Sequence, residues 1–117
     1  RRGRGGYSMI ARFWHGRTRA RQADEFLAYL HKTGGKECRA ILGNRGVMIF
    51  HRLDGEEADF LFCSLWDSLD AIRRFAGEKI EAAVYYPGDK DFLLELEPTV
   101  THYEVSGDLP SDFFALK

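Results

Sequence analysis

Histidine, tyrosine and arginine are the side chains of this sequence that could act chemically on a small molecule. His102 lies in residues 99–106, TVTHYEVS, which read as a β-strand that places Val100 and Glu104 on the same side. A neutral imidazole there could act as a base and take a proton from a bound small molecule. The alternative is a strand histidine whose hydrogen bonds are purely structural.

Two adjacent tyrosines and two arginines are further candidates. Tyr85 and Tyr86 end residues 78–86, which we expect to form one or two helical turns before Pro87 stops them. Consecutive helix residues point about 100° apart, so one ring could face a pocket while the other packs elsewhere. Arg12 and Arg45 could bind an acidic group, although arginine is commonly solvated or salt-bridged at a surface.

The remaining reactive side chains lack a catalytic or metal-binding pattern. No HxH, HxxxH or HxxE cluster is present, so we expect neither a metal nor a cofactor. Cys38 and Cys63 lack metal-type spacing and are expected to be reduced thiols. His15 and His51 read as ordinary strand residues. GNRG at 43–46 is too short for a phosphate-binding loop.

Composition indicates one globular domain. The 117 residues are 44% hydrophobic with a net charge of −1, enough for one core. We expect an extension over 1–8, a domain over 9–106 and a tail over 107–117. The balanced charge argues against nucleic acid as a partner, although RRGRGGYS at 1–8 leaves an RNA-binding arm conceivable. No apolar run approaches membrane-spanning length, and we expect a cytoplasmic protein that does not bind membranes.

The hydrophobic pattern predicts four strands and two helices. We expect strands at 9–16, 41–53, 58–66 and 99–106, and helices at 18–35 and 67–77. Thr18 is the expected N-cap of the first helix and Gly34-Gly35 its end, and Gly43 and Gly46 suggest a bulge. Asp54-Gly55 is a strong hairpin signal. The order β-α-β-β-α-β predicts an α+β, ferredoxin-like fold with a four-stranded antiparallel sheet.

Two central segments predict a dimer. VMIF at 47–50 and FLFCSLW at 60–66 are apolar at consecutive positions, so both faces of these strands should avoid water. Two helices can cover only one face of the sheet. We therefore expect a homodimer in which the second face packs against the same face of another copy.

Three segments carry a resemblance to a known family. SLWDSLDAIRRFAG at 64–77, AVYYPGDKDFLLELEPTVTHYEV at 83–105 and the opening MIARFWHGR at 9–17 resemble the antibiotic biosynthesis monooxygenase domain family. The resemblance covers about residues 9–106. It implies a dimeric α+β barrel, oxidation of polyketide-type phenols by molecular oxygen without metal or flavin, and a pocket between sheet and helices.

The resemblance also suggests site residues. It places Trp66 in the pocket wall, where the indole could stack on a planar ligand and orient it through its N–H. The expected catalytic residues are His102 and Trp66. The expected substrate-binding residues are Trp66, Phe62, Tyr85, Tyr86, Trp14 and Arg12. The alternative for Trp66 is a core residue that closes the end of the sheet.

Departures from the family pattern leave two functions open. Phe62 stands where quinone-forming members carry asparagine, Ile72 where a tyrosine is often found, and Ala76 where haem-degrading members carry histidine. The first hypothesis is a cofactor-independent monooxygenase acting on an aromatic molecule. The second is a non-catalytic dimeric protein of the same fold that binds a small molecule or serves in a stress response.

Overall fold

The computed structural model describes residues 9–107. The predicted extension over 1–8 and the tail beyond Gly107 lie outside the described residues. Within them, no helix has the length and apolar character needed to cross a membrane.

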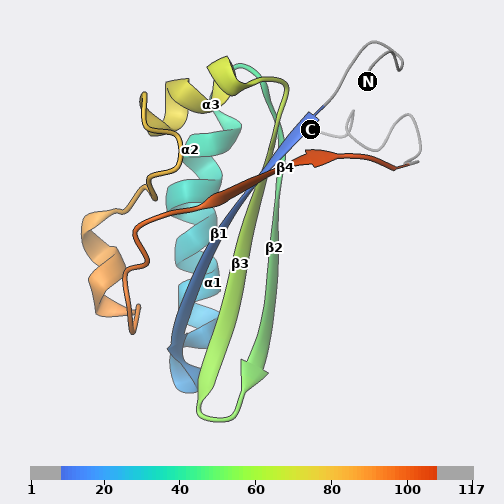
Figure 1. The fold of residues 1–117 in the computed structure, drawn as a ribbon. Helices are drawn as coiled ribbons and strands as arrows, with labels where there is room; N and C mark the ends of the chain where they lie inside the picture. Colours follow the sequence, from blue (N-terminus) through green and yellow to red (C-terminus); the bar gives the residue numbers. More distant parts are fainter. Residues whose placement is uncertain (1–8, 108–117) are drawn as a thin grey trace.

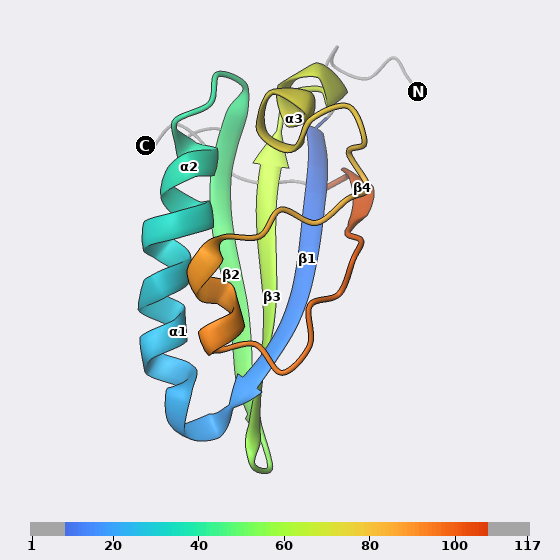
Figure 2. The ribbon, with the colours of Figure 1, turned by 90° about the vertical axis from the view of Figure 1, so that its left-hand side faces the viewer.

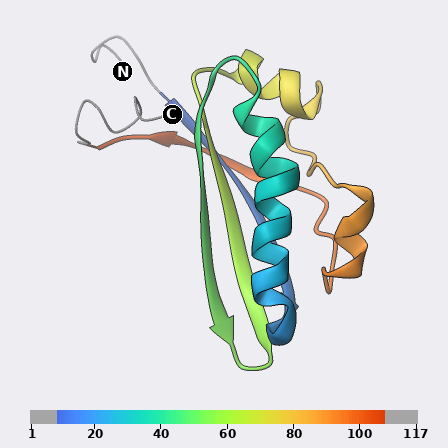
Figure 3. The same cartoon turned by 180° about the vertical axis from the view of Figure 1, so that it is seen from behind.

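The described chain is an α+β fold built on a four-stranded antiparallel sheet. The strands are β1 (Met9–Arg19), β2 (Asn44–Asp54), β3 (Glu57–Trp66) and β4 (Thr101–Val105), in the spatial order β2-β3-β1-β4. Figures 1 and 3 show the helices on one side of this sheet. The predicted ferredoxin-like arrangement is therefore confirmed.

Strand β1 is longer than predicted. The sequence suggested that Gly16 ends it, but the strand continues to Arg19. Gly16 serves a packing role instead, because a Cβ there would lie 2.3 Å from the Trp14 ring. Thr18, predicted as a helix cap, is a fully buried strand residue whose hydroxyl donates to the Arg19 carbonyl.

The first helical region does not end at its two glycines. It comprises a 3-10 turn (Ala20–Gln22), α1 (Ala23–Leu30), a π-helical segment (His31–Gly35) and α2 (Lys36–Arg39). Cys38, expected in a loop, therefore lies in α2. Gly34 and Gly35 are buried, and a Cβ on Gly34 would lie 3.4 Å from the Phe62 ring. The helical region thus continues through a pair of glycines that local sequence reads as a helix end.

The predicted hairpin and bulge are confirmed. β2 pairs antiparallel with β3 through Asp54 and Glu57, and Gly55 has φ +66°, a conformation that favours glycine. The register between these strands shifts between Asn44 and Gly46. The bulge therefore lies where the sequence placed it.

The chain after β3 is partly as predicted. Helix α3 (Leu69–Ala76) begins at Ser68, whose hydroxyl oxygen accepts from the Ala71 N–H at 3.1 Å, and ends before Gly77. Leu69, the first residue of this helix, is 42% exposed.

The expected helical turns over 78–86 are absent, and this prediction was wrong. That segment is extended coil with a single bridge between Ala82 and Thr99, followed by a 3-10 turn (Pro87–Asp91). One local hydrogen bond is present, from the Ala82 N–H to the Lys79 carbonyl at 3.0 Å. Other carbonyls bond outside the segment: Ala82 O accepts from Arg12, and Glu81 O accepts from the Val100 N–H at 2.8 Å. Long-range partners replace the local helical hydrogen bonds.

The main core lies between the sheet and the helices. Its fully buried members include Trp66, Phe26, Phe60 and Ile72. The opposite face of the sheet carries only a small buried cluster of Ala11, Cys63 and Leu65. This second face has no covering layer among the described residues (Figure 1).

Candidate functional site

A cavity lies on the helix side of the sheet. In Figure 2 the segment between α3 and β4 crosses in front of the strands beside α1. The lining residues are Arg12, Trp14, Leu30, Thr33, Gly34, Phe62, Ser64, Phe75, Val84, Tyr85, Tyr86, Asp89 and Val100. Five of the predicted binding residues are thus brought together: Arg12, Trp14, Phe62, Tyr85 and Tyr86.

The cavity is partly open to solvent and has little enclosed volume. Its unfilled space is ≈490 Å³ when the solvent-open mouth is counted, whereas the volume that the centre of a water molecule could occupy is ≈40 Å³. A cavity that takes benzene measures on the order of 150 Å³. A single aromatic ring would therefore extend into the solvent-open part of the cavity, or require the wall to move.

Arg12 supplies a buried positive charge to the cavity. The residue is 3% exposed, and its guanidinium donates to the carbonyls of Ile80 and Ala82. It also lies 5.7 Å from the centre of the Phe75 ring. No carboxylate forms an ion pair with Arg12 within residues 9–107. Burial lowers the pKa of Arg12, because the charged form loses its hydration, and the charge of Glu81 opposes this shift only in part.

His102 contacts Arg12 instead of lining the cavity. Its Nε2 lies 3.1 Å from Arg12 Nη1, and because a guanidinium only donates, the imidazole nitrogen must accept. Burial and the charge of Arg12 lower the pKa of His102, which favours the neutral ring. Taking a substrate proton at Nε2 would break this bond and put two cations side by side. The structure thus places His102 beside Arg12 and outside the cavity lining, and its role as base stays a prediction.

Tyr85 joins the cavity wall to the chain leading into β4. Its hydroxyl donates to the Glu97 carbonyl at 2.6 Å and accepts from Trp14 Nε1 at 3.2 Å. The Trp14 and Tyr85 rings also pack edge to face, 6.2 Å apart. Burial raises the pKa of Tyr85, so its hydroxyl stays protonated at neutral pH.

Asp89 is a lining residue that sequence reasoning missed. It is 5% exposed, its Oδ2 accepts from the Tyr86 N–H at 2.6 Å, and Tyr29 also bonds to its carboxylate. Burial raises its pKa, opposed by these hydrogen bonds. In the sequence Asp89 stands in the polar run GDKD, which resembles an ordinary turn.

Tyr86 faces the same end of the cavity. Its hydroxyl donates to Glu37 Oε1 at 2.6 Å, and burial together with this carboxylate raises its pKa strongly. Both predicted tyrosines therefore line the cavity, which was not expected for neighbours on a helix. They can do so because the backbone here is extended.

Trp66 does not line the cavity. Its indole is fully buried, stacks on Phe75 with ring centres 6.0 Å apart, and donates from Nε1 to Ser64 Oγ at 2.8 Å. The N–H expected to orient a ligand is thus already bonded. Of the two readings of this residue, the structure favours the core tryptophan that closes the end of the sheet.

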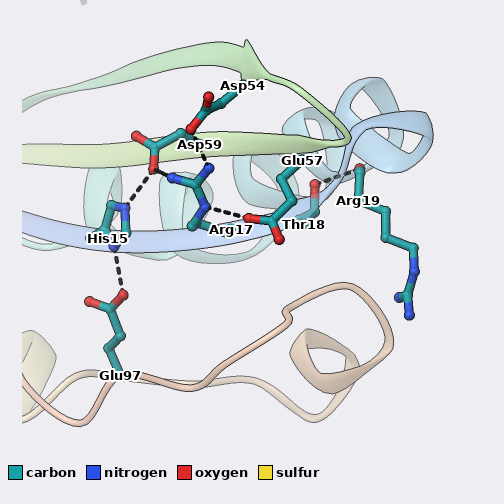
Figure 4. Close-up of polar contacts among 8 residues, drawn as sticks. All are labelled: His15, Arg17, Thr18, Arg19, Asp54, Glu57, Asp59 and Glu97. Atoms are coloured by element: carbon teal, nitrogen blue, oxygen red, sulfur yellow. Dashed lines mark hydrogen bonds and ion pairs between the residues drawn. The ribbon is translucent and has the colours of Figure 1, made fainter.

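His15, predicted as an ordinary strand residue, lies in a charged cluster instead. Figure 4 shows it between two carboxylates, with Nε2 2.7 Å from Asp59 and Nδ1 2.6 Å from Glu97. Arg17 shares Asp59 and also contacts Asp54 and Glu57, each at 2.7 Å. Burial lowers the pKa of His15, but Asp59 and Glu97 outweigh it and raise it overall. An imidazole that bonds to two carboxylates donates from both nitrogens, so it is protonated here.

The other candidates lie away from the cavity. Arg45 pairs with Asp67 at 3.7 Å on the surface, and the His51 ring stacks on Phe60. Cys38 and Cys63 are buried free thiols, and burial raises their pKa values to about 12 and about 11. In the described ranges, no three His, Cys, Asp or Glu side chains gather as they would around a metal ion.

Comparison with known proteins yields a distant structural likeness. No family model matches the sequence, and no curated protein matches it. The solved structure of Rv0793 from Mycobacterium tuberculosis is similar over 89% of this chain and 99% of that chain, with 17% identity and a TM-score of 0.49. The strand order and helix placement of the chain itself, seen in Figure 1, therefore define its fold.

Proposed function

We propose that this protein binds an aromatic, polyketide-type small molecule in the cavity between sheet and helices. The observation that carries the proposal is Arg12, a buried cation without a carboxylate partner in the described chain, set in a wall rich in aromatic rings. Aromatic walls with few fixed polar groups are typical of ligand pockets. Trp14, Phe62, Tyr85 and Tyr86 would contact the ring of the ligand, and Arg12 its oxygen.

The two tryptophans of the chain allow a direct test by NMR. Trp14 lines the cavity and bonds to Tyr85, whereas Trp66 is buried behind the wall. Titration with 4-methylphenol should shift the indole N–H signal of Trp14 and leave that of Trp66 nearly unchanged, with cyclohexylmethanol as the non-aromatic control. Equal shifts of both signals, or none up to millimolar concentration, would contradict the proposal.

Cofactor-independent oxygenation is the second candidate function. Arg12 and Asp89 line one cavity and could together favour ionisation of a phenol, which is the step that prepares it for reaction with oxygen. Conversion of a phenol to a quinone gives four electrons to O₂, with one oxygen atom entering the product and the other leaving as water. No external reductant is then needed.

An oxygen electrode separates the two candidates. Oxygen uptake that requires both the protein and a phenol or its keto tautomer, such as 1-naphthol or anthrone, and that falls in an Arg12→Gln variant would establish the enzyme. Reversible binding of the same compounds without oxygen uptake would establish the non-catalytic binding protein. Phe62, in place of the family's asparagine, favours this second outcome.

We further propose that the protein is a homodimer through the open face of the sheet. The strand register places Phe13, Met48, Phe50, Leu61 and Tyr103 on that face. Phe50 is 49% exposed and Tyr103 58%, an unusual exposure for aromatic residues on a sheet. Burying this stripe against a second copy would remove it from water.

Light scattering after size-exclusion chromatography tests the dimer. The wild type should have twice the chain mass of 13.4 kDa, and Phe50→Lys should shift it to the monomer. Leu42→Lys is the matched control, because Leu42 is 81% exposed and lies outside the strands. A wild-type monomer at micromolar concentration would refute the proposal.

A further inference from the structure

Two buried groups of opposite charge line the cavity without pairing with each other. Arg12 comes from β1, and Asp89 comes from the 3-10 turn after the coil. Both are at least 95% buried, and no ion pair connects them in the part of the chain that the structure describes. In Figure 2 this 3-10 turn lies beside α1 and in front of β2, whereas β1 lies beyond β3, so the two charged residues reach the cavity from different sides.

At the Arg12 end, the hydrogen-bond acceptors are all neutral, and the Glu81 carboxylate acts on the guanidinium only through its charge, without an ion pair. The hydrogen-bond partners of Arg12 are two carbonyls and the neutral His102 ring. A guanidinium has five N–H donors, and these bonds use three of them. An anionic oxygen in the cavity would receive the remaining donors and compensate the charge.

At the other end, Asp89 offers an acceptor. One backbone N–H and the Tyr29 hydroxyl bond to its carboxylate, which has about four lone-pair positions. An ionised carboxylate only accepts, so the matching ligand group is a donor such as a hydroxyl. A second anion would be repelled here.

Between the two ends, the wall is aromatic. Trp14, Phe62, Phe75 and Tyr85 all line the cavity. A flat ring that carries its polar groups at opposite ends would satisfy the wall and both charges together. A ligand with its polar groups on one edge would leave one charge unpaired.

Building on the proposed function, we infer that the ligand is an aromatic hydroxy acid. Its anionic oxygen accepts hydrogen bonds from Arg12, and its hydroxyl group donates a hydrogen bond to the Asp89 carboxylate. The protein then recognises the ligand by which of its ends carries the negative charge and which carries the hydrogen-bond donor. The negative end enters toward β1 and the donor end toward Asp89.

A set of single-ring probes tests this inference on the wild-type protein. The compounds are 4-hydroxybenzoate, benzoate, 4-hydroxybenzamide and methyl 4-hydroxybenzoate, each titrated against the Trp14 indole N–H signal at pH 7.5. We expect 4-hydroxybenzoate to bind about tenfold or more tightly than the neutral amide and ester, because a charge-assisted bond to arginine replaces a neutral one. Benzoate should also bind more weakly than 4-hydroxybenzoate, because it lacks the donor for Asp89.

Variants assign each preference to its residue. Arg12→Gln should remove the preference for acid over amide, and Asp89→Asn should reduce the preference for 4-hydroxybenzoate over benzoate. Arg45→Gln and Asp91→Asn are the matched controls, since neither residue lines the cavity. The wild-type probe series decides the question even where an Arg12 variant folds poorly.

The outcomes separate this inference from the function on which it rests. Neutral probes that bind as tightly as 4-hydroxybenzoate would overturn the charge assignment while leaving an aromatic-binding protein. Failure of all four probes and of 4-methylphenol would overturn both. An acid preference that survives in Arg12→Gln would also refute the assignment to Arg12.

Discussion

Gly16 gives the sharpest test of how the cavity wall is packed. An added Cβ at this position would lie 2.3 Å and 2.7 Å from two atoms of the Trp14 ring and 3.0 Å from Leu93. Ordinary carbon contacts begin near 3.5 Å, so the ring would have to move by about 1 Å. Such a movement would also disturb the bond from Trp14 to Tyr85.

The expected cost of Gly16→Ala follows from this overlap. Overpacking of a well-filled site costs about 1–3 kcal/mol of the free energy of unfolding. In a domain of this size each kcal/mol shifts the melting temperature by about 4–8 °C. We therefore expect a fall of about 4 °C or more, together with a shifted Trp14 indole N–H signal.

Gly34→Ala is the matched control. Its Cβ would lie 3.4 Å from the Phe62 ring, an ordinary contact, and alanine is favoured over glycine inside a helix by roughly 1 kcal/mol. Calorimetry should thus show the two substitutions moving the melting temperature in different directions, or Gly34→Ala leaving it unchanged. A Gly16→Ala protein as stable as the wild type would refute the packing described for Trp14.

Three further predictions concern stability. Because the pKa of His15 is raised on folding, its contribution to the free energy of unfolding is fully present below the unfolded pKa of about 6.5 and is lost as pH rises through the folded pKa. Urea unfolding should therefore show a larger loss of stability for His15→Gln at pH 6 than at pH 9. Equal losses at the two pH values would contradict the protonated pairing with Asp59 and Glu97. Ser64→Ala should cost about 1–3 kcal/mol in chemical unfolding, because it leaves the buried Trp66 N–H without an acceptor, and a change below 0.5 kcal/mol would count against that bond. Ser68→Ala should cost about 1 kcal/mol through loss of the cap of α3, whereas an unchanged unfolding midpoint would show that the cap is dispensable.

The charged cluster of Figure 4 connects the edge of the sheet to the cavity wall. His15 holds the Glu97 carboxylate, while the Glu97 carbonyl receives the Tyr85 hydroxyl. Glu97 thus links the coil before β4 to both faces of β1, through its side chain on one face and through its backbone carbonyl on the other. This explains how a segment without regular structure keeps Tyr85 in place.

Local sequence signals determined much of the fold. The Asp54-Gly55 turn, the glycine-marked bulge and the apolar periods of the strands predicted the topology, because each acts over a few residues. Five cavity residues were also predicted, since aromatic and arginine side chains at these positions could be recognised by type and by resemblance.

Long-range contact decided the rest. Residues 78–86 have helix-compatible composition, yet their carbonyls bond to Arg12 and Val100, which are distant in sequence. Gly34 and Gly35 resemble a helix end but remain helical, buried against other elements. No local pattern could show these competing partners.

The candidate site was likewise predicted in part from the sequence and decided in part by long-range contacts. The sequence by itself identified Arg12, His102 and Trp66 as candidates, but their roles depended on which atoms already had partners. Only the tertiary structure showed His102 bonded to Arg12, Trp66 bonded to Ser64 and Asp89 buried in the cavity wall. Residue type fixes what a side chain can donate or accept, whereas the fold decides which of those bonds remain open to a ligand.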